Sequence, residues 1–188
     1  SPVTQLTHSR KPAFIRRMTR ISAVLCSALF LAGCAAPEGP ANHLEKANVL
    51  PLALDRDFQF RKTQLEFVDS SVPPVRTVSE AAVFERARAT WGAIDSTEIA
   101  KRNGNYFHFF WRSRQTADVT VRLEYRQAGL GNYVMAQERY YPGVRGSRKS
   151  SFQVTGDEFL ENGRVTGWRV LLIVDGRIVA LRQSYIWR

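Results

Sequence analysis

Three acidic residues lie close together in the segment 156–163: Asp157, Glu158 and Glu161. Carboxylates at this spacing suggest calcium binding, or the acid and base of a glycoside hydrolase. A calcium loop, however, needs oxygen ligands where Phe159 and Leu160 stand. No two acids have a partner residue that distinguishes them from surface residues. We therefore predict a solvated turn and no metal site, with hydrolysis through Asp157 and Glu158 as the alternative.

Two further residues could take part in acid–base or metal chemistry, His43 and His108. His43 lies in a segment of linker composition and His108 in an aromatic run, so together they form neither a metal cluster nor a base with an orienting partner. The sequence has no nucleophile elbow and no dinucleotide fingerprint, and 129–131 is too short for a phosphate-binding loop. We predict no catalytic, cofactor-binding or metal-binding residue, and interpret His108 as structural.

Cations gather in the segment Gly143–Ser151, which carries Arg145, Arg148 and Lys149. Three cations near one turn could contact the phosphate or carboxylate groups of an anionic polymer. The alternative is a soluble loop that binds nothing. We predict a mobile loop and name these three cations as candidate anion-binding residues.

Six aromatic side chains could form a sugar-binding face, because flat rings pack against the apolar faces of pyranoses. Strands also use such residues to fill a core, and we favour that interpretation. The six residues are Tyr106, Tyr133, Tyr140, Tyr141, Tyr185 and Trp187.

An eleven-residue apolar run, Ile21–Leu31, follows a basic cluster near the start of the sequence and ends in Leu-Ala-Gly-Cys at Cys34. A helix of this length covers roughly half of a hydrocarbon core about 30 Å thick, so the run is too short to be a membrane span. Its order of basic residues, short apolar run and small residues is typical of an export signal that is removed. The basic residues are Arg16, Arg17 and Arg20.

The sequence Leu31-Ala32-Gly33-Cys34 resembles the lipobox of bacterial lipoproteins. The resemblance implies a diacylglyceryl group on the Cys34 sulfur, cleavage at Gly33 and anchoring of the mature protein to a membrane. Ala35 and Ala36 follow, without the aspartate that resembles an inner-membrane retention signal, so we predict the outer membrane. Met18 is a second candidate for the start of translation, and we leave the residues before it out of the fold.

The remaining cysteine, Cys26, lies inside the apolar run, so the predicted mature chain has only the Cys34 thioether. This excludes a disulfide, a cysteine-based zinc site and a cysteine nucleophile, so packing must stabilise the protein. Removing 33 of the 188 residues leaves 155, enough for one domain, and lowers the formal net charge from +10 to +5. Such a charge gives poor support for nucleic-acid binding.

The predicted organisation is a removed leader over 1–33, a lipidated linker over 34–48 and one domain over 49–188. Two prolines and a glycine in Ala35–Ala47 predict disorder there. A helix is predicted over Ser79–Thr90, with irregular structure as the alternative. Alternating apolar and polar residues predict strands over these segments: 58–68 with an interruption near Arg61–Thr63, Tyr106–Arg112, Asp118–Arg126 with one wet face, Tyr133–Tyr141 and Ser151–Thr155.

Asp175 and Gly176 lie between two apolar runs and predict a hairpin with a type I′ turn. Counting outward from the turn pairs Leu172 with Val179 and Val170 with Leu181. Arg169 would then oppose Arg182, so that face is expected to be in water. The core face is predicted to consist of Trp168, Val170, Leu172, Val179 and Leu181.

The number of short strands predicts a mainly β fold, an antiparallel sandwich or a barrel, and we favour the sandwich. Trp111 in an early aromatic strand, together with a final hairpin, resembles the immunoglobulin and fibronectin type III arrangement. The cysteine pair of an antibody domain is missing. We expect a lipid-anchored, non-catalytic binding or assembly module with a protein or glycan partner. The alternatives are an enzyme acting on envelope polymers and a purely structural lipoprotein.

Overall fold

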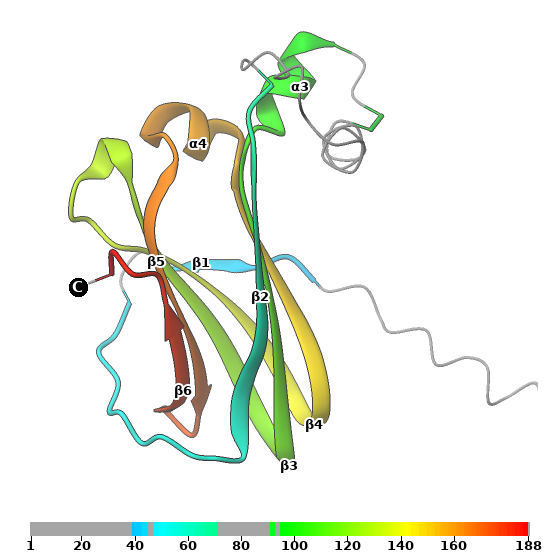
Figure 1. The fold of residues 1–188 in the computed structure, drawn as a ribbon, viewed down its shortest axis with the longest axis vertical. Coiled ribbons are helices and arrows are strands. Elements are labelled where there is room, and N and C mark those ends of the chain that lie inside the picture. The colour runs from blue at the N-terminus through cyan, green and yellow to red at the C-terminus, as the bar shows by residue number, and fades with distance from the viewer. Residues whose placement is uncertain (1–38, 45–46, 71–90, 93–94, 188) are drawn as a thin grey trace, which may run out of the picture. The chain divides into compact units, whose positions relative to one another are not determined.

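The computed structural model describes residues 39–44, 47–70, 91–92 and 95–187, all of which belong to the unit Glu38–Arg188. Six antiparallel strands make one hydrogen-bonded sheet in the order β1-β4-β3-β5-β6, with β2 paired to β3 off this path (Figure 1). The strands and helices, in chain order, are β1 (Asn42–Leu44), β2 (Phe58–Val68), α3 (Ser96–Lys101), β3 (Gly104–Gln127), the 3₁₀ helix η1 (Ala128–Leu130), β4 (Met135–Thr155), α4 (Gly156–Asn162), β5 (Val165–Val174) and β6 (Arg177–Gln183).

The long strands β3 and β4 pair with each other and bend sharply together, so each contributes to two layers (Figure 1). The first half of β3 pairs with β2 over 104–113, and its second half pairs with β5 over 120–127. We call β2 and the adjoining parts of β3 and β4 (104–113 and 147–155) the front layer. The back layer contains β1, β5, β6 and the parts 119–127 of β3 and 135–141 of β4.

The bend has local causes in both strands. In β3 the pairing shifts between Ser113 and Ala117 and again before Val119. In β4 Pro142 has no backbone N–H to donate, and Gly143 and Gly146 have φ values of 55° and 92° that favour glycine. Asp118 fixes the corner, because its carboxylate accepts hydrogen bonds from the Gly143 N–H at 2.7 Å and the Tyr140 hydroxyl at 2.9 Å.

The core lies between the two layers and is rich in aromatic side chains. Trp168 of β5 contacts Phe109 and Phe107 of the front layer, with ring centroids 5.5 and 6.4 Å apart. Trp111 is buried as expected, and its indole N–H donates to the Ser150 hydroxyl at 2.9 Å. The mainly β, antiparallel fold is confirmed. All six strands share one sheet, so an immunoglobulin-like sandwich of two sheets is not confirmed.

The segment 58–68, predicted as one or two strands with an interruption near Arg61–Thr63, is one strand with a bulge between Phe60 and Lys62. Other predicted boundaries are wrong because strands continue through irregular positions. The strands predicted separately in 106–126 are joined in β3, and those in 133–155 are joined in β4. The predicted mobile loop Gly143–Ser151 is therefore part of a strand, since its backbone pairs with β3.

Three other expectations also need correction or lie outside the description. Asn42–Leu44, predicted as disordered linker, form β1 and pair with β4. The predicted acidic turn is the helix α4. The helix predicted over Ser79–Thr90 lies outside the described residues, as do Cys34 and the apolar run before it.

The final hairpin has the predicted turn, with positive φ at Asp175 and Gly176. Its predicted register is wrong beyond the pair Ile173–Ile178, because a bulge follows that pair. Leu172 lies opposite Ala180, Val170 opposite Arg182 and Arg169 opposite Gln183. Of the predicted core face, Leu181 is exposed and the other members belong to the core or pack against it.

The two open sides of the bent sheet are closed differently. On one side, Arg139 and Gln137 of the back layer donate to Ser151 O at 2.7 Å and Gln153 O at 3.0 Å, which joins the two halves of β4. On the other side, a groove lies between β2 and β6, and the Arg182 guanidinium donates to the Thr63 hydroxyl at 3.4 Å.

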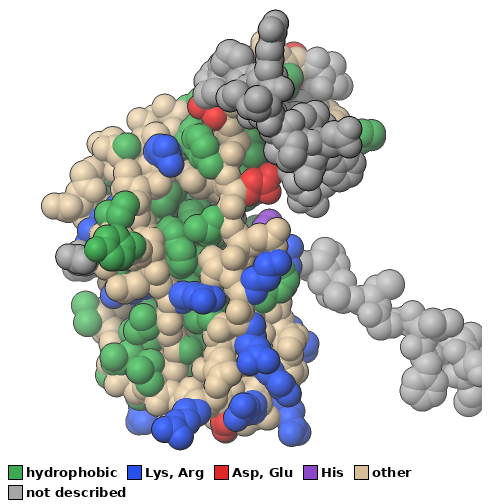
Figure 2. All heavy atoms as spheres, viewed as in Figure 1, with side chains coloured by type: hydrophobic (Ala, Val, Ile, Leu, Met, Phe, Trp, Pro, Cys, Tyr) green, Lys and Arg blue, Asp and Glu red, His purple; other side chains and the backbone are tan. Residues whose placement is uncertain are grey.

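The surface has an uneven distribution of charge. In the view of Figure 1, Lys and Arg side chains gather over the lower part of the surface (Figure 2).

Candidate functional site

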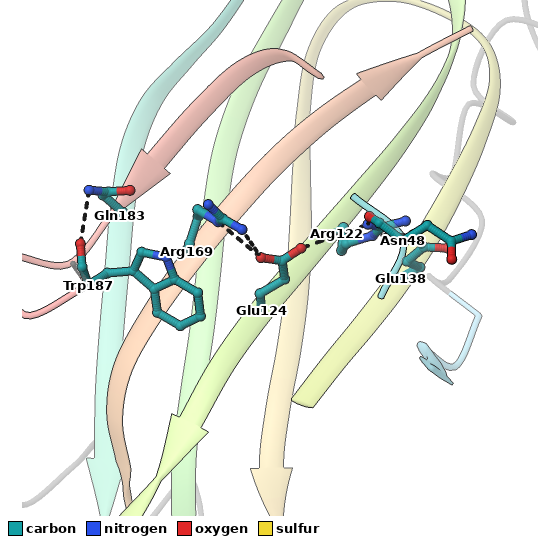
Figure 3. A network of polar contacts seen from close by, with 7 residues as sticks. All are labelled: Asn48, Arg122, Glu124, Glu138, Arg169, Gln183 and Trp187. Carbon is teal, nitrogen blue, oxygen red and sulfur yellow. Dashed lines mark hydrogen bonds and ion pairs between the residues drawn. The ribbon is translucent and has the colours of Figure 1, made fainter. Parts of the chain in front are cut away.

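A network of ion pairs lies on the outer face of the back layer, and we call it the charged network: Arg122, Glu124, Glu138 and Arg169 (Figure 3). The sheet register positions these groups. Arg122 of β3 lies opposite Glu138 of β4, and Glu124 of β3 lies opposite Arg169 of β5. Opposite charges on neighbouring strands attract each other, which favours this alignment.

Glu124 is the centre of the charged network. One carboxylate oxygen accepts hydrogen bonds from Arg169, at 3.0 Å from Nε and 2.5 Å from Nη2. Its other oxygen is 3.8 Å from Arg122 Nη1. Arg122 also donates to Glu138 at 2.6 Å and to the Asn48 carbonyl at 2.9 Å. Two arginines and two glutamates therefore neutralise one another.

The middle of the charged network is buried although it lies on the side of the sheet away from the core. Arg122 and Glu124 are 6% and 4% exposed, whereas the Glu138 and Arg169 side chains are half-buried. The segment 47–55, which we call the strap, crosses this side and bonds to the edge of β6. Ile178 N–H donates to Pro51 O, and Ala53 N–H donates to Ile178 O, both at 2.9 Å. The strap thus excludes water from side chains that the strand pattern predicted to be wet.

Trp187 forms one wall of the site and packs beside Gly167 of β5, where a Cβ would be in ordinary contact with the indole ring at 3.6 Å. The indole is 7% exposed and carries two guanidinium groups, Arg126 at 4.7 Å and Arg169 at 5.2 Å from the ring. Gln183 holds the terminal turn by donating to Trp187 O at 3.1 Å. Guanidinium groups stacked on indole are attracted by the ring quadrupole.

A pocket of about 570 Å³ lies beside the charged network and beneath the first residues of the strap. Apolar and aromatic side chains supply most of its walls, and Glu124, Arg126 and Arg169 supply the charged groups. The apolar and aromatic residues are Ala47, Val49, Leu50, Tyr133, Val134, Leu171, Ile178 and Trp187. Its volume is in the range of small-ligand sites.

The carboxylate of this pocket is already paired. Among the described lining residues Glu124 alone carries a carboxylate, and two arginines bind it. A general base must be free to take a proton within hydrogen-bond reach, which Glu124 is not. A guanidinium beside an indole and apolar walls can instead hold a carboxylate and the flat part of the same ligand.

The structure separates the candidate anion-binding residues. Lys149 lies on the outer face of the front layer, and its neighbour Arg148 is directed to the opposite face because successive strand residues alternate. Arg145 lies at the bend, outside the front layer, where the pairing of β4 is irregular. Arg148 donates to Ser147 O at 3.1 Å and is exposed. Arg145 donates to Arg114 O, also at 3.1 Å.

The other residues considered from the sequence are scattered. His108 contacts the Ser151 hydroxyl at 3.0 Å, and His43 lies in β1 opposite Gln137. The acids of α4 do not face one another across a cleft: Asp157 and Glu161 are exposed, while Glu158 accepts a hydrogen bond from the buried Tyr125 hydroxyl at 2.5 Å. Among the described residues, no group of three or more His, Cys, Asp and Glu could hold a metal ion.

Two of the six candidate sugar-binding aromatics, Tyr133 and Trp187, line the pocket. Sequence reasoning missed the charged network beside them, because it treated Arg122 and Glu124 as solvated. A signal was available: opposite charges occur on β3 and on β5, where Arg169 is followed by the apolar residues Leu171 and Ile173 on the same face. Apolar residues between charges indicate a covered surface.

Comparisons with known proteins do not extend this description. The chain matches no protein-family model, no curated protein and no solved structure at a significant level.

Proposed function

We propose that this chain is a lipid-anchored protein of a bacterial envelope, with the lipid on Cys34 and an outer-membrane location. Its β domain acts as a non-catalytic binding module. The partner is an envelope glycan or protein segment that presents a carboxylate beside an apolar or sugar-ring face. An immunoglobulin-like relationship belongs to the same proposal, supported by Trp111 in the core and by the final hairpin.

The pocket beside the charged network is the observation that carries the proposed function. Glu124, the acid among its described lining residues, is paired with arginines, while Trp187 and Tyr133 offer aromatic surface and Arg126 offers a cation at the same pocket. This combination suits ligand binding, in which a bidentate guanidinium recognises a carboxylate and a ring packs against the remainder.

The lipobox resemblance carries the proposed location. None of the helices among the described residues has the length and apolar composition needed to cross a membrane. Cys34 acylation is tested by labelling cells with a fatty acid and comparing the parent with Cys34→Ser. The parent is expected to carry label that the variant loses, and label in both would contradict acylation at Cys34.

Ligand binding is tested by titrating the purified, detergent-solubilised protein with soluble peptidoglycan fragments that carry carboxylates. Arg126→Gln is expected to weaken binding by about tenfold or more, since hydrogen bonds to charged groups contribute about 1.5–3 kcal/mol. Arg164→Gln is the matched control, because Arg164 also stacks on an aromatic ring, Phe67 at 5.0 Å, but does not line the pocket.

Equal binding by Arg126→Gln and Arg164→Gln would remove the pocket as the site. Absence of binding to these fragments, together with absence of any protein crosslinked through the pocket in cells, would contradict the binding function itself.

A further inference from the structure

The outer face of the front layer is basic at the end nearest the bend, whereas Glu66 lies at its other end, opposite Tyr106. Lys62 and Lys149 lie on either side of Phe110, on three neighbouring strands, and Arg112 follows Phe110 on the same face of β3. Arg145 extends this row along β4. We call these five residues the basic face. Figure 2 shows Lys and Arg side chains gathered over the lower part of the surface, where Figure 1 places the bend of β3 and β4.

The cations of the basic face have no acidic partners among the described residues. None of Lys62, Arg112, Arg145 and Lys149 forms an ion pair there. Lys62 and Lys149 instead lie over the Phe110 ring, 5.7 and 5.8 Å from its centroid. Like charges gathered on one sheet face disfavour folding. A partner that carries several negative charges would relieve this repulsion.

The shape of the basic face favours an extended partner. Side chains of a sheet stand perpendicular to it, and three strands at about 4.8 Å spacing spread Lys62, Phe110 and Lys149 over about 10 Å. Arg112 and Arg145 continue the charge along the strands. Such a spread of charge fits a surface with many phosphates better than one small anion.

The chain leading to Cys34 leaves the domain beside this face. Arg139 donates to Gly39 O through Nη1 and to Ser151 O at 2.7 Å through Nε. Ser151 is only two residues along β4 from Lys149. Four residues lie between Cys34 and Gly39, and the five steps that join them span at most about 18 Å. An acyl chain on Cys34 therefore keeps this side of the domain close to the bilayer.

We propose that the basic face docks on the anionic surface of the bilayer in which Cys34 is anchored. This inference rests on the lipid anchor of the proposed function. The occupant of the basic face is then the layer of lipid phosphates. The pocket beside the charged network lies on the outer face of the other layer, so docking turns the pocket away from the membrane and toward its partner.

The test places a fluorescent probe on the basic face of the acylated protein through Ser147→Cys, since Ser147 is exposed and lies opposite Arg112. The protein is reconstituted on vesicles of phosphatidylcholine alone or mixed with phosphatidylglycerol, and a neutral aqueous quencher reports access to the probe. The probe is expected to be shielded on the anionic vesicles only, and high salt is expected to expose it.

Charge variants then identify the surface. Lys62→Glu with Lys149→Glu is expected to restore quenching, because each cation near an anionic membrane contributes roughly fivefold to the docking equilibrium. The milder pair Lys62→Gln with Lys149→Gln is expected to have a smaller effect in the same direction. Arg56→Glu with Arg177→Glu is the control, because it changes net charge equally at exposed residues outside the basic face.

The outcomes separate docking from anchoring. If the protein floats with neutral vesicles but its probe is quenched equally on neutral and anionic vesicles, docking is overturned and the anchor is not. If the protein does not float with neutral vesicles, the lipid anchor on Cys34 is contradicted. The charge variants on anionic vesicles then still show whether the basic face binds lipid. Shielding by a soluble anionic glycan, but not by anionic vesicles, would overturn the bilayer as the partner.

Discussion

The two outer faces of the domain differ in how their charged side chains are buried and paired. On the back layer, Arg122 and Glu124 are buried under the strap, and the charges of the network pair. On the front layer, Lys62, Arg112 and Lys149 are exposed and form no ion pair with an acid among the described residues. The difference teaches that strand alternation identifies the residues that face away from the core. Whether water reaches these residues depends on whether another segment of the chain covers that face of the sheet.

The same difference separates two roles for charge. Removing one member of a buried pair leaves an uncompensated charge, so the charged network controls stability. Removing one member of a solvated cluster changes long-range attraction and leaves folding almost unaffected. The predictions below test this separation.

The largest effect is expected from Glu124→Gln, which leaves Arg122 and Arg169 without their shared counter-charge. The free energy of unfolding should fall by about 3 kcal/mol or more, measured by chemical denaturation. Lys62→Gln on the basic face should change it by less than about 0.5 kcal/mol. Losses of similar size at the two positions would show that the faces do not differ in this way.

The buried hydroxyl of Tyr125, between the two faces, allows the loss of a neutral donor to be compared with the loss of a buried charge. Tyr125 donates to Glu158, and Gln137 donates to Tyr125 at 3.2 Å. Tyr125→Phe should destabilise the protein by about 1–3 kcal/mol, because it leaves these partners unsatisfied. A smaller loss than at Glu124 would indicate that removing a buried charge between two arginines costs more than removing a neutral hydroxyl donor.

The Tyr125 hydroxyl also predicts an alkaline limit to stability. Burial, followed by the neighbouring Glu158, raises its pKa well above the ordinary value near 10. The folded protein therefore favours the protonated form, and this contribution is complete below pH 10 and is lost as pH rises further. The melting temperature should fall above pH 10 in the parent and fall less steeply in Tyr125→Phe. Parallel curves would contradict this assignment.

A smaller effect is expected from neutralising the basic face. Repulsion among its cations should make the parent more stable as salt is raised from about 0.01 M to about 0.5 M, because salt screens exposed charges. In Lys62→Gln with Lys149→Gln, this gain should shrink by about 0.5 kcal/mol. Arg56→Gln with Arg177→Gln controls for net charge, and an equal reduction there would place the repulsion elsewhere.

The smallest effect is expected at Asp118, the exposed acid at the bend next to the basic face. The Gly143 N–H, followed by the Tyr140 hydroxyl, lowers the pKa of its carboxyl from the ordinary value near 3.8. Its contribution is present above that value and is lost as pH falls through the lowered pKa. Thermal unfolding of Asp118→Asn between pH 5 and pH 2 should therefore show a shallower decline than the parent.

The sequence predicts the positions of most strands but not their continuity. Alternation restarts at the bend, so the parts of β3 on either side of 114–117 look like separate strands. Pro142 and Gly143 look like a stop, yet β4 bends there and continues. The hairpin register depends on a bulge after Ile178. Ala53 and Asp55 of the strap donate to Ile178 O and Val179 O, a distant contact that local pattern does not encode.

The candidate site was less predictable than the fold. Trp187 and Tyr133 were named among aromatics that could face a ligand, but nothing local indicates that the strap encloses one side of their pocket. The three cations named near the bend were treated as one group. Their strand places Lys149 on one face, Arg148 on the other and Arg145 at the bend, while Lys62 and Arg112 come from other strands.

The bend shared by β3 and β4 has a consequence for how the domain unfolds. Each layer takes part of its backbone hydrogen bonding from the same two strands, and Arg139 and Gln137 join their two halves. Unfolding of one layer would therefore remove backbone hydrogen bonds and side-chain contacts from the other. The layers are therefore a single cooperative unit, and slow amide exchange should extend across both rather than protect one alone.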